Sequence, residues 1–389
     1  MKLALLQGNR FTPWHLAAFR HLRENPDITA FRAESEIQRH FESQGADALD
    51  FPIEPIHFDT HAGFWIERVK NRFLARYGNR EAQILPFHER LRGFDLLQSW
   101  ELFTDWSGEA AEARRKWDIP LAVMVWDNIP FNMEHSAYRR DIKAHVRKQA
   151  DRFLVHTERS RRMLRLEGVE DARIVKIAPG VDTHLFSPGT PDRARFGFDA
   201  EDLVLLFVGW LLPRKGIDFL LMALRELVDD PKLAGRRLRL WMVGAGPGRD
   251  RVEALVRRLG LEQVCVFGGS APYTEMPAYF RVADVFVLPS IATPQWQEQF
   301  GMSLIEAMAS GVPVVSTLSG AIPEIVGDAG LLCQPNDFVA LHGALRRLLT
   351  DPSARQELAQ RGRTHAESCF SLEGYAENLS AIYEEMLRG

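Results

Sequence analysis

Residues 297–315 read QEQFGMSLIEAMASGVPVV, and this stretch decides the fold class. It predicts a loop, a helix that begins near Gly301, a glycine stop at Gly311 and a short buried strand. A glycine at position 301 permits close approach of a ligand to the backbone. The amides of residues 300–303 would open the helix, where free N–H groups and the helix dipole favour an anion. The stretch therefore predicts an α/β unit with an anion site at a helix N-terminus.

Two acidic residues lie in the same stretch with seven residues between them. Glu298 precedes the predicted helix and Glu306 lies about one turn inside it. Both carboxylates could face one bound ligand, and carboxylates accept hydrogen bonds well from sugar hydroxyls. The alternative is a first-turn acid favoured by the helix dipole at Glu298 and a solvent-facing helix residue at Glu306. Spacing alone does not separate these interpretations.

Short apolar runs alternate with amphipathic segments along the rest of the chain, which is the pattern of parallel sheets with crossover helices. We predict strands at residues 3–7, 96–100, 121–126, 153–157, 203–208, 238–243, 264–267, 285–288 and 312–316. We predict helices near residues 13–22, 106–116, 136–150, 249–259, 338–349, 352–367 and 372–387. Proline and glycine cluster around residues 178–200, so the domain boundary is expected there. The predicted fold class is α/β, with two Rossmann-like domains.

Composition and charge limit the class of protein. The chain of 389 residues is longer than one hydrophobic core usually organises, which favours two domains. Hydrophobic residues make up 46% and charged residues 26%, which excludes a disordered or collagen-like chain. The formal net charge of -4 disfavours a globally basic nucleic-acid binder. Three cysteines without a close pair fit a reducing cytoplasm, and no apolar run is long enough to span a membrane.

A basic turn follows the strand predicted at residues 203–208. Residues 208–216 read VGWLLPRKG, which places Gly209, Arg214 and Lys215 at the carboxyl edge of the sheet, where open α/β sheets bind ligands. A guanidinium beside an ammonium suits the oxygens of a diphosphate. The alternative is an ordinary solvated basic turn.

A glycine-rich turn follows the next strand. Residues 244–249 read GAGPGR, which is superficially like a dinucleotide fingerprint. Arg249 occupies the position of the third glycine and Pro247 rigidifies the turn, so we interpret the segment as a tight turn over a ligand mouth and not as an NAD site.

These motifs, in this order, resemble the GT-B nucleotide-sugar glycosyltransferases of family 4, also called glycosyl transferases group 1. The resemblance spans most of the second half and includes residues 179–188, 209–216, 244–247, 267–268, 283–290, 298–306, 330–332 and 370–383. It implies an N-terminal Rossmann-like acceptor domain over residues 1–180 and a C-terminal donor domain over residues 181–370. A final helix over residues 371–389 would return to the N-terminal domain.

The resemblance also implies roles for individual residues. Glu298 would bind donor sugar hydroxyls and Glu306 the ribose hydroxyls, while Arg214 and Lys215 would neutralise the diphosphate leaving group. Arg214, Lys215 and Glu298 are thus the predicted catalytic residues. The remaining predicted donor-binding residues are Gly8, Gly209, Gly244, Phe267, Gly268, Gly269, Phe300, Gly301, Met302 and Ser303.

The first half departs from the family pattern. Members commonly have a His after the strand that corresponds to residues 121–125, and Trp126 stands there. Retaining transfer in this family is generally viewed as needing no protein base at the acceptor oxygen, so the chemistry could survive the change. Glu101, Trp126, Asp127 and Asn128 are the candidates for the sugar or acceptor side. The alternative is that these polar groups cap helices or turns at strand ends.

The predicted activity is metal-independent transfer of a hexose, with retention, from a nucleoside diphosphate sugar to a glycan or lipid-linked hydroxyl. The alternatives are a nucleotide-sugar epimerase and a sugar-nucleotide binding module that has lost its catalytic activity. No D-x-D motif occurs, and we interpret His57, Asp59 and His61 as a solvated loop and not as metal ligands.

The predicted location is the cytoplasm, with peripheral contact at the inner face of the membrane as a further expectation. Residues 135–166 hold ten Lys and Arg against three acids, a net charge of +7. Residues 69–80 interleave apolar and basic side chains, which suits an anionic lipid surface. Solvated helix faces with ion pairs remain the alternative.

Overall fold

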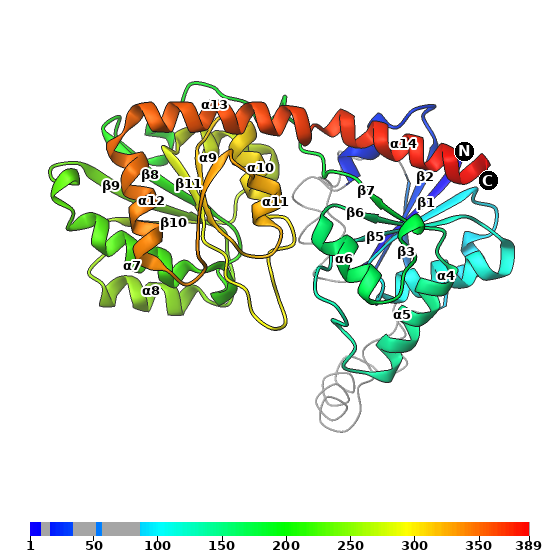
Figure 1. Ribbon diagram of the computed structural model, residues 1–389. Helices are drawn as coiled ribbons and strands as arrows, with labels where there is room; N and C mark the ends of the chain where they lie inside the picture. Colours follow the sequence, from blue (N-terminus) through cyan, green and yellow to red (C-terminus); the bar gives the residue numbers. More distant parts are fainter. Residues whose placement is uncertain (9–15, 34–51, 57–85, 389) are drawn as a thin grey trace. The chain divides into compact units, whose positions relative to one another are not determined.

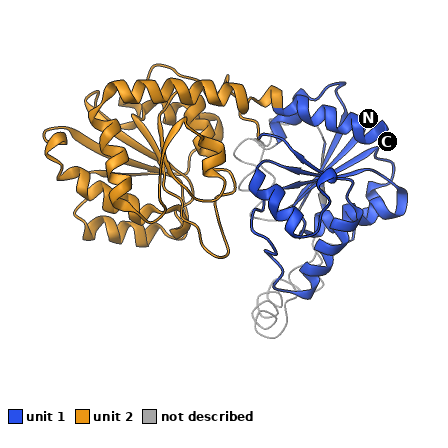
Figure 2. Ribbon diagram, viewed as in Figure 1, with its two compact units in different colours: residues 1–178, 375–389 blue, residues 179–374 orange. Residues whose placement is uncertain are grey.

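The computed structural model describes residues 1–8, 16–33, 52–56 and 86–388 (Figure 1). The chain forms two compact units (Figure 2). Unit 1 comprises residues 1–178 and 375–389, and unit 2 comprises residues 179–374. The first division falls two residues before the one predicted at 180/181, and the chain re-enters unit 1 at Tyr375, within its last helix.

Unit 1 is built on a seven-stranded parallel sheet with the order β3-β2-β1-β4-β5-β6-β7. Its strands are β1 (Lys2–Gly8), β2 (Asp27–Ala33), β3 (Ile53–Ile56), β4 (Leu96–Trp100), β5 (Leu121–Val125), β6 (Arg152–Val155) and β7 (Ile174–Lys176). Every residue of β4 and β5 is buried, so these two strands form the centre of the sheet. Because all strands are parallel, their carboxyl ends lie along one edge.

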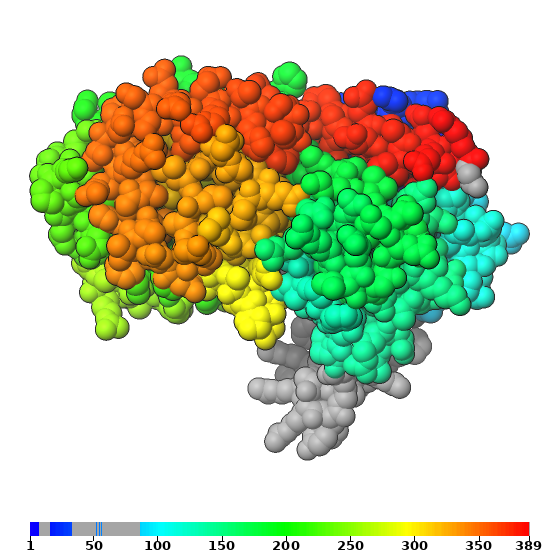
Figure 3. Space-filling view, in the orientation of Figure 1, coloured from blue at the N-terminus to red at the C-terminus, as the bar shows by residue number. Residues whose placement is uncertain are grey.

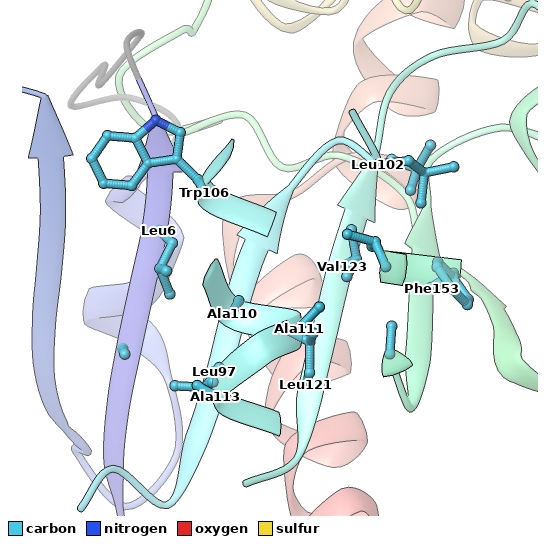
Figure 4. Close-up of a cluster of buried hydrophobic side chains, with 14 of the residues drawn as sticks. Leu6, Leu97, Leu102, Trp106, Ala110, Ala111, Ala113, Leu121, Val123 and Phe153 are labelled. Atoms are coloured by element: carbon cyan, nitrogen blue, oxygen red, sulfur yellow. The ribbon is translucent and has the colours of Figure 1, made fainter. Parts of the chain in front are cut away.

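One hydrophobic cluster of unit 1 lies between this sheet and the helices that follow its strands, with α4 (Asp105–Trp117) the main contributor (Figure 4). Three alanines of α4, Ala110, Ala111 and Ala113, are fully buried, and small side chains let the helix backbone approach the strands closely. The other helices of unit 1 among its described residues are η1 (Ala17–His21), η3 (His88–Leu91), α5 (Ala137–Gln149), α6 (Glu158–Leu166) and η4 (Asp171–Arg173), to which the end of α14 (Leu372–Arg388) is added.

The end of α14 is anchored to the sheet of unit 1 by a buried polar contact. The Tyr383 hydroxyl donates to Oε1 of Gln98, and both side chains are buried. The Tyr375 ring packs edge-on against the ring of His156, with centroids 5.6 Å apart. From Tyr375 onward, the last helix is therefore an integral part of unit 1.

Unit 2 holds a six-stranded parallel sheet with the order β10-β9-β8-β11-β12-β13. Its strands are β8 (Asp202–Val208), β9 (Arg237–Val243), β10 (Cys265–Gly269), β11 (Val285–Leu288), β12 (Val314–Thr317) and β13 (Gly330–Cys333). The order reverses between β8 and β11, and this switch point is where open sheets of this kind bind ligands.

The sheet of unit 2 is covered by helices that connect its strands. They are α7 (Ile217–Val228), α8 (Arg249–Arg258), α9 (Met276–Val282), α10 (Met302–Ala309), α11 (Ile322–Val326), α12 (Phe338–Thr350) and α13 (Pro352–Cys369), with short helices η5 (Ala194–Phe196), η6 (Pro213–Lys215), η7 (Pro231–Leu233) and η8 (Tyr273–Glu275). Side chains of α12 and α13, coloured orange, cover much of one face of unit 2 (Figure 3).

Most predicted strands and helices are confirmed, but α6 and β7 in the first half and α7, α9, α11 and β13 in the second half were not predicted. Further corrections fall in the first half. The helix predicted at residues 13–22 is a 3-10 helix over Ala17–His21, as far as the described residues show. β2 and β3 were not predicted. β3 contains Pro55 and Glu54 and lies at the edge of the sheet, where an apolar run is not required.

Candidate functional site

The loops at the carboxyl edge of the unit 2 sheet interlock through their glycines. Gly244, after β9, has a φ of +137°, and a Cβ there would lie 2.0 Å from the carbonyl oxygen of Gly209, after β8. The Leu211 amide donates to the Ala245 carbonyl at 2.9 Å, and the Gly248 amide donates to the Leu211 carbonyl at 2.9 Å. The glycines of the 244–248 turn are therefore needed for contact between two backbones, which explains them without a dinucleotide.

Arg214 and Lys215 lie together in η6, at the end of the β8 loop. The following Gly216 has a φ of +69°, and a Cβ there would lie 1.9 Å from the Pro289 carbonyl oxygen. The Ile291 amide donates to the Arg214 carbonyl at 2.9 Å. This backbone contact ties the basic turn to the loop that follows β11, across the switch point of the sheet.

Both cations lie over one aromatic ring. The Arg214 guanidinium is 4.5 Å from the centroid of the Trp296 ring, and the Lys215 ammonium is 5.1 Å from it. Such cation–π contacts orient the charges without neutralising them. Sequence reasoning missed Trp296. The available signal for Trp296 was its position two residues before Glu298.

Glu298 is buried and carries two hydrogen bonds on one oxygen. The Lys215 ammonium donates to Glu298 Oε2 at 2.7 Å, and the Ser290 hydroxyl donates to the same oxygen at 2.6 Å. α10 begins only at Met302, so Glu298 is not a first-turn acid of that helix. The structure thus brings Arg214, Lys215 and Glu298 together, as the sequence predicted.

The N-terminus of α10 lies in the same loop region. Gly301 caps the helix with a φ of +73°, and a Cβ there would lie 2.7 Å from the Leu304 side chain. Phe300 is buried, while Met302 and Ser303 are half-buried. The predicted start of the helix is therefore confirmed, and its first turn follows Glu298 by a few residues.

Glu306 is buried and hydrogen-bonds to a tyrosine that the sequence analysis did not identify. Its side chain pairs with Tyr273, in η8. Burial raises the pKa of Glu306 to about 7, and the Tyr273 hydrogen bond acts in the opposite direction. The pKa of Tyr273 is raised by burial and by the charges of Glu306 and Asp182. The solvent-facing interpretation of Glu306 is wrong, because only 6% of the residue is exposed.

The segment predicted to meet the nucleotide base ends β10. The Arg249 guanidinium lies 5.2 Å from the centroid of the Phe267 ring. A Cβ at Gly268 would lie 2.6 Å from the Trp241 indole nitrogen, so glycine is required there by packing. Gly269 has a φ of +67°, and its carbonyl accepts from the Gly244 amide at 2.7 Å. Contact of Phe267, Gly268 and Gly269 with a base stays a prediction.

In unit 1, the candidates for the acceptor side gather at the ends of the adjacent strands β4 and β5. The Trp126 amide donates to Glu101 Oε1 at 3.1 Å. Burial, and next the charge of Asp127, raise the pKa of Glu101 to about 8. Glu101 also has a φ of +63°, which is unusual for a residue with a side chain. A neutral carboxyl group at this edge can donate a hydrogen bond as well as accept one.

Asp127 acts as a turn residue in the loop after β5. Its Oδ1 accepts from the Asn128 amide at 2.8 Å, the Ile129 amide at 3.2 Å and the Asn132 side-chain amide at 3.1 Å. These contacts fit the alternative of a turn-forming side chain for Asp127. Asn128 is buried, and Gly8 ends β1 at the same edge of the sheet.

His156 lies directly after β6 and was not identified from the sequence. Its Nδ1 is 2.9 Å from the Ile177 carbonyl oxygen, and burial lowers its pKa to about 4. The ring is therefore neutral at pH 7. The available signal for His156 was a histidine at a strand end. Its ring contacts Tyr375 of α14, as expected for a packing residue.

Comparison with known proteins places this geometry in a family. The model of glycosyl transferases group 1 matches residues 190–365, and that of glycosyltransferase family 4 matches residues 44–185. D-inositol 3-phosphate glycosyltransferase of Corynebacterium aurimucosum is 32% identical over 295 residues, which cover 70% of this chain and 68% of the relative. The chain belongs to the family 4 glycosyltransferases. The relative of the same name from Acidothermus cellulolyticus is 32% identical over 72% of this chain and 65% of its own length.

Solved structures share the fold of this glycosyltransferase along its whole length. Anabaena Alr3699/HepE in complex with UDP and glucose has a TM-score of 0.77 and 18% identity, covering 99% of this chain and 100% of that one. WaaG, a glycosyltransferase of lipopolysaccharide biosynthesis, has a TM-score of 0.67 and 17% identity, covering 98% and 99%. The two parallel sheets thus have the GT-B architecture.

The basic segment of the glycosyltransferase, residues 135–166, forms α5, α6 and β6, and many of its cations are paired. Lys143 is buried and contacts Glu167 at 2.7 Å and Glu134 at 3.0 Å. Further ion pairs join Arg147 to Glu167, Arg152 to Glu385, Arg161 and Arg165 to Asp171, and Arg162 to Glu158. The ion-pair interpretation therefore explains much of this local charge.

The described part of this glycosyltransferase holds neither a membrane-spanning helix nor a clustered metal site. None of its helices has the length and apolar character needed to cross a membrane. No cluster of three or more His, Cys, Asp or Glu suited to a metal ion occurs among the described residues. His57, Asp59 and His61, and the apolar and basic stretch at residues 69–80, lie outside them.

Proposed function

We propose that this glycosyltransferase moves a hexose from a nucleoside diphosphate sugar to an acceptor hydroxyl, with retention of the anomeric configuration. The observation that carries the proposal is the cluster at the carboxyl edge of unit 2. It joins two cations, Arg214 and Lys215, to a buried carboxylate, Glu298, that Lys215 contacts at 2.7 Å. Cations suit a diphosphate and a carboxylate suits sugar hydroxyls, so the cluster can bind both parts of the donor.

In this proposal the site acts by electrostatic stabilisation of the leaving group. Arg214, Lys215 and the first amides of α10 would stabilise the charge that grows on the departing diphosphate. Glu298 would accept from the sugar hydroxyls and Glu306 from the ribose hydroxyls. The backbone of residues 267–269 would meet the base, and Gly8, Gly209 and Gly244 would keep the loops close to the donor.

The acceptor would be a glycan or lipid-linked hydroxyl that lies near the ends of β4 and β5 in unit 1. Glu101, Trp126 and Asn128 are the proposed contacts. The raised pKa of Glu101 supports a hydrogen bond donated by its neutral carboxyl to an acceptor oxygen. The relatives named D-inositol 3-phosphate glycosyltransferase add that inositol phosphate to the acceptors to be tried.

We further propose that catalysis needs no divalent ion, because two cationic side chains are already placed at the leaving group. Initial rates should persist in extensively chelated enzyme with excess EDTA at fixed ionic strength, with at most modest stimulation by Mg²⁺. Complete loss of activity that only a divalent ion restores would contradict this, and His57, Asp59 and His61 would then be the first residues to mutate.

We also propose a cytoplasmic location with peripheral contact to anionic lipid. Exposed cations of the basic segment that lie outside the ion pairs described above, such as Lys148, support this. Co-sedimentation with phosphatidylglycerol vesicles should decrease with rising salt, since screening weakens surface charge interactions. Binding equal to that seen with phosphatidylcholine vesicles would contradict it.

The test of the activity is a matrix of donors and acceptors. UDP, GDP and ADP hexoses are first screened for thermal stabilisation, since a ligand at 100 times its dissociation constant adds about 2.7 kcal/mol. The stabilising donor is then incubated with glycan, lipid-linked and inositol phosphate acceptors, and the glycosylated product is identified by mass. Donor conversion without an acceptor would indicate an epimerase, and tight binding without transfer to any acceptor would indicate a retired binding module.

A further inference from the structure

Two hydrogen-bond donors from different loops contact the same oxygen of the Glu298 carboxylate. Lys215 approaches from the loop after β8 and Ser290 from the loop after β11, and both donate to Oε2, at 2.7 and 2.6 Å. Ser290 is fully buried, and 5% of Glu298 is exposed. A carboxylate has about four acceptor sites, so these two donors occupy one oxygen and fix the direction of the other.

The backbones on either side of this contact are held independently. The Ser290 carbonyl accepts from the Thr317 hydroxyl of β12. The Glu298 carbonyl accepts from the Ala321 amide at 2.9 Å. Gly320 packs on Glu298 so closely that a Cβ there would lie 2.1 Å from the Glu298 carbonyl oxygen. With both backbones fixed, Lys215 and Ser290 both restrict the side-chain torsions of Glu298.

The two donors differ in how a donor substrate would affect them. Lys215 is a cation, so a bound diphosphate competes with Glu298 for its ammonium protons. Ser290 is neutral and buried, so a diphosphate offers it no comparable attraction. The hydroxyl contact should therefore persist when the ammonium is drawn toward the diphosphate.

We propose that Ser290 is a positioning residue that holds Glu298 Oε2, so that the carboxylate keeps a fixed direction toward one hydroxyl of the donor sugar. The inference rests on the proposed donor site. It assigns to Ser290 a part in selection of the sugar, and none in binding of the nucleotide.

The test compares Ser290→Ala with Ser290→Thr, which keeps the hydroxyl, and with Ser310→Ala as a matched control. Ser310 is also buried, at the end of α10, and its hydroxyl has no hydrogen-bond partner among the described residues. Each variant is assayed for kcat and KM with the best donor and with mono-deoxy analogues of its sugar. Affinity for the nucleoside diphosphate and thermal stability are measured in parallel.

We expect Ser290→Ala to lower kcat/KM for the intact donor about 10- to 100-fold, the range for loss of a hydrogen bond to a charged group. The loss of kcat/KM should be smaller with the one deoxy analogue that lacks the hydroxyl bound by Glu298. Nucleoside diphosphate affinity should stay within about twofold of wild type. Ser290→Thr should recover most of the activity, and Ser310→Ala should behave as wild type.

Two results would overturn the assignment of Ser290. One is an unchanged kcat/KM in Ser290→Ala, and the other is an equal loss for every analogue together with lost nucleotide affinity and stability, which indicates a merely structural side chain. A wild-type protein that neither binds nor uses any nucleotide sugar would instead refute the proposed function, and the role of Ser290 with it.

Discussion

Donor binding should depend on the ionisation of Glu306. The carboxyl has a pKa raised from 4.5 to about 7 by burial. If ribose hydroxyls must donate to it, the ionised form binds the donor and the neutral form binds poorly. Binding should therefore be strongest above pH 7 and weaken as pH falls through 7. At pH 6 about one molecule in ten is ionised, so affinity should fall about tenfold from pH 8, or about 1.4 kcal/mol.

The perturbation is Glu306→Gln, which keeps the shape and removes the charge. The variant should bind the donor more weakly than wild type at both pH 8 and pH 6. The gap between the two proteins should shrink about tenfold from pH 8 to pH 6, because wild-type Glu306 is mostly neutral at pH 6. The ligand is an intact nucleotide sugar, since the terminal phosphate of a nucleoside diphosphate titrates near pH 6 itself.

The assay is calorimetry of donor binding without acceptor, in buffers of different ionisation enthalpy. At pH 7 the wild type should release about half a proton per donor bound, because half of Glu306 is protonated beforehand. The Gln variant should lack that release. Equal proton release in both proteins, or parallel affinity profiles from pH 6 to 8, would refute the role of Glu306.

Three further predictions address the leaving group, the sugar and the last helix. Arg214→Ala should lower kcat about 100- to 1,000-fold with a smaller change in donor affinity, since its charge complements the transition state; an effect confined to KM in steady-state kinetics would show that Arg214 only binds. Glu298→Ala should abolish most donor use while circular dichroism stays native, and wild-type turnover would contradict its assignment. Tyr383→Phe should destabilise unit 1 by about 1–3 kcal/mol, because Gln98 Oε1 loses the hydroxyl that donates to it. An unchanged thermal transition would show that this contact contributes nothing.

The sequence predicted the bounds of fully buried strands best. β11 matches its predicted bounds, because a buried parallel strand needs a continuous apolar run between turn residues. β3 escaped prediction because an edge strand can carry Pro55 and Glu54. The positions of Arg214 and Lys215 followed from a general rule, since the carboxyl ends of parallel strands meet at one edge. Glu298 was assigned to the same site by the resemblance to family 4.

The partners within the site could not be read from the sequence. Ser290, Tyr273 and Trp296 reach the predicted residues from other loops, and no fixed spacing announces such contacts. The burial of Glu306 is likewise a tertiary property. It depends on packing around α10, including Tyr273 of η8, and the sequence of α10 alone does not reveal it. The turns at 209–216 and 244–248 show the same limit, because their glycines serve contact between loops that are distant in sequence.

The most direct test of the account is the anomeric configuration of the product, followed by proton NMR during transfer from an α-linked nucleotide hexose. The account predicts a new α-linked sugar signal, appearing only with acceptor present and in step with release of nucleoside diphosphate, and nearly absent with Glu298→Ala. A β-linked product, or a changed sugar signal without any nucleoside diphosphate released, would contradict it.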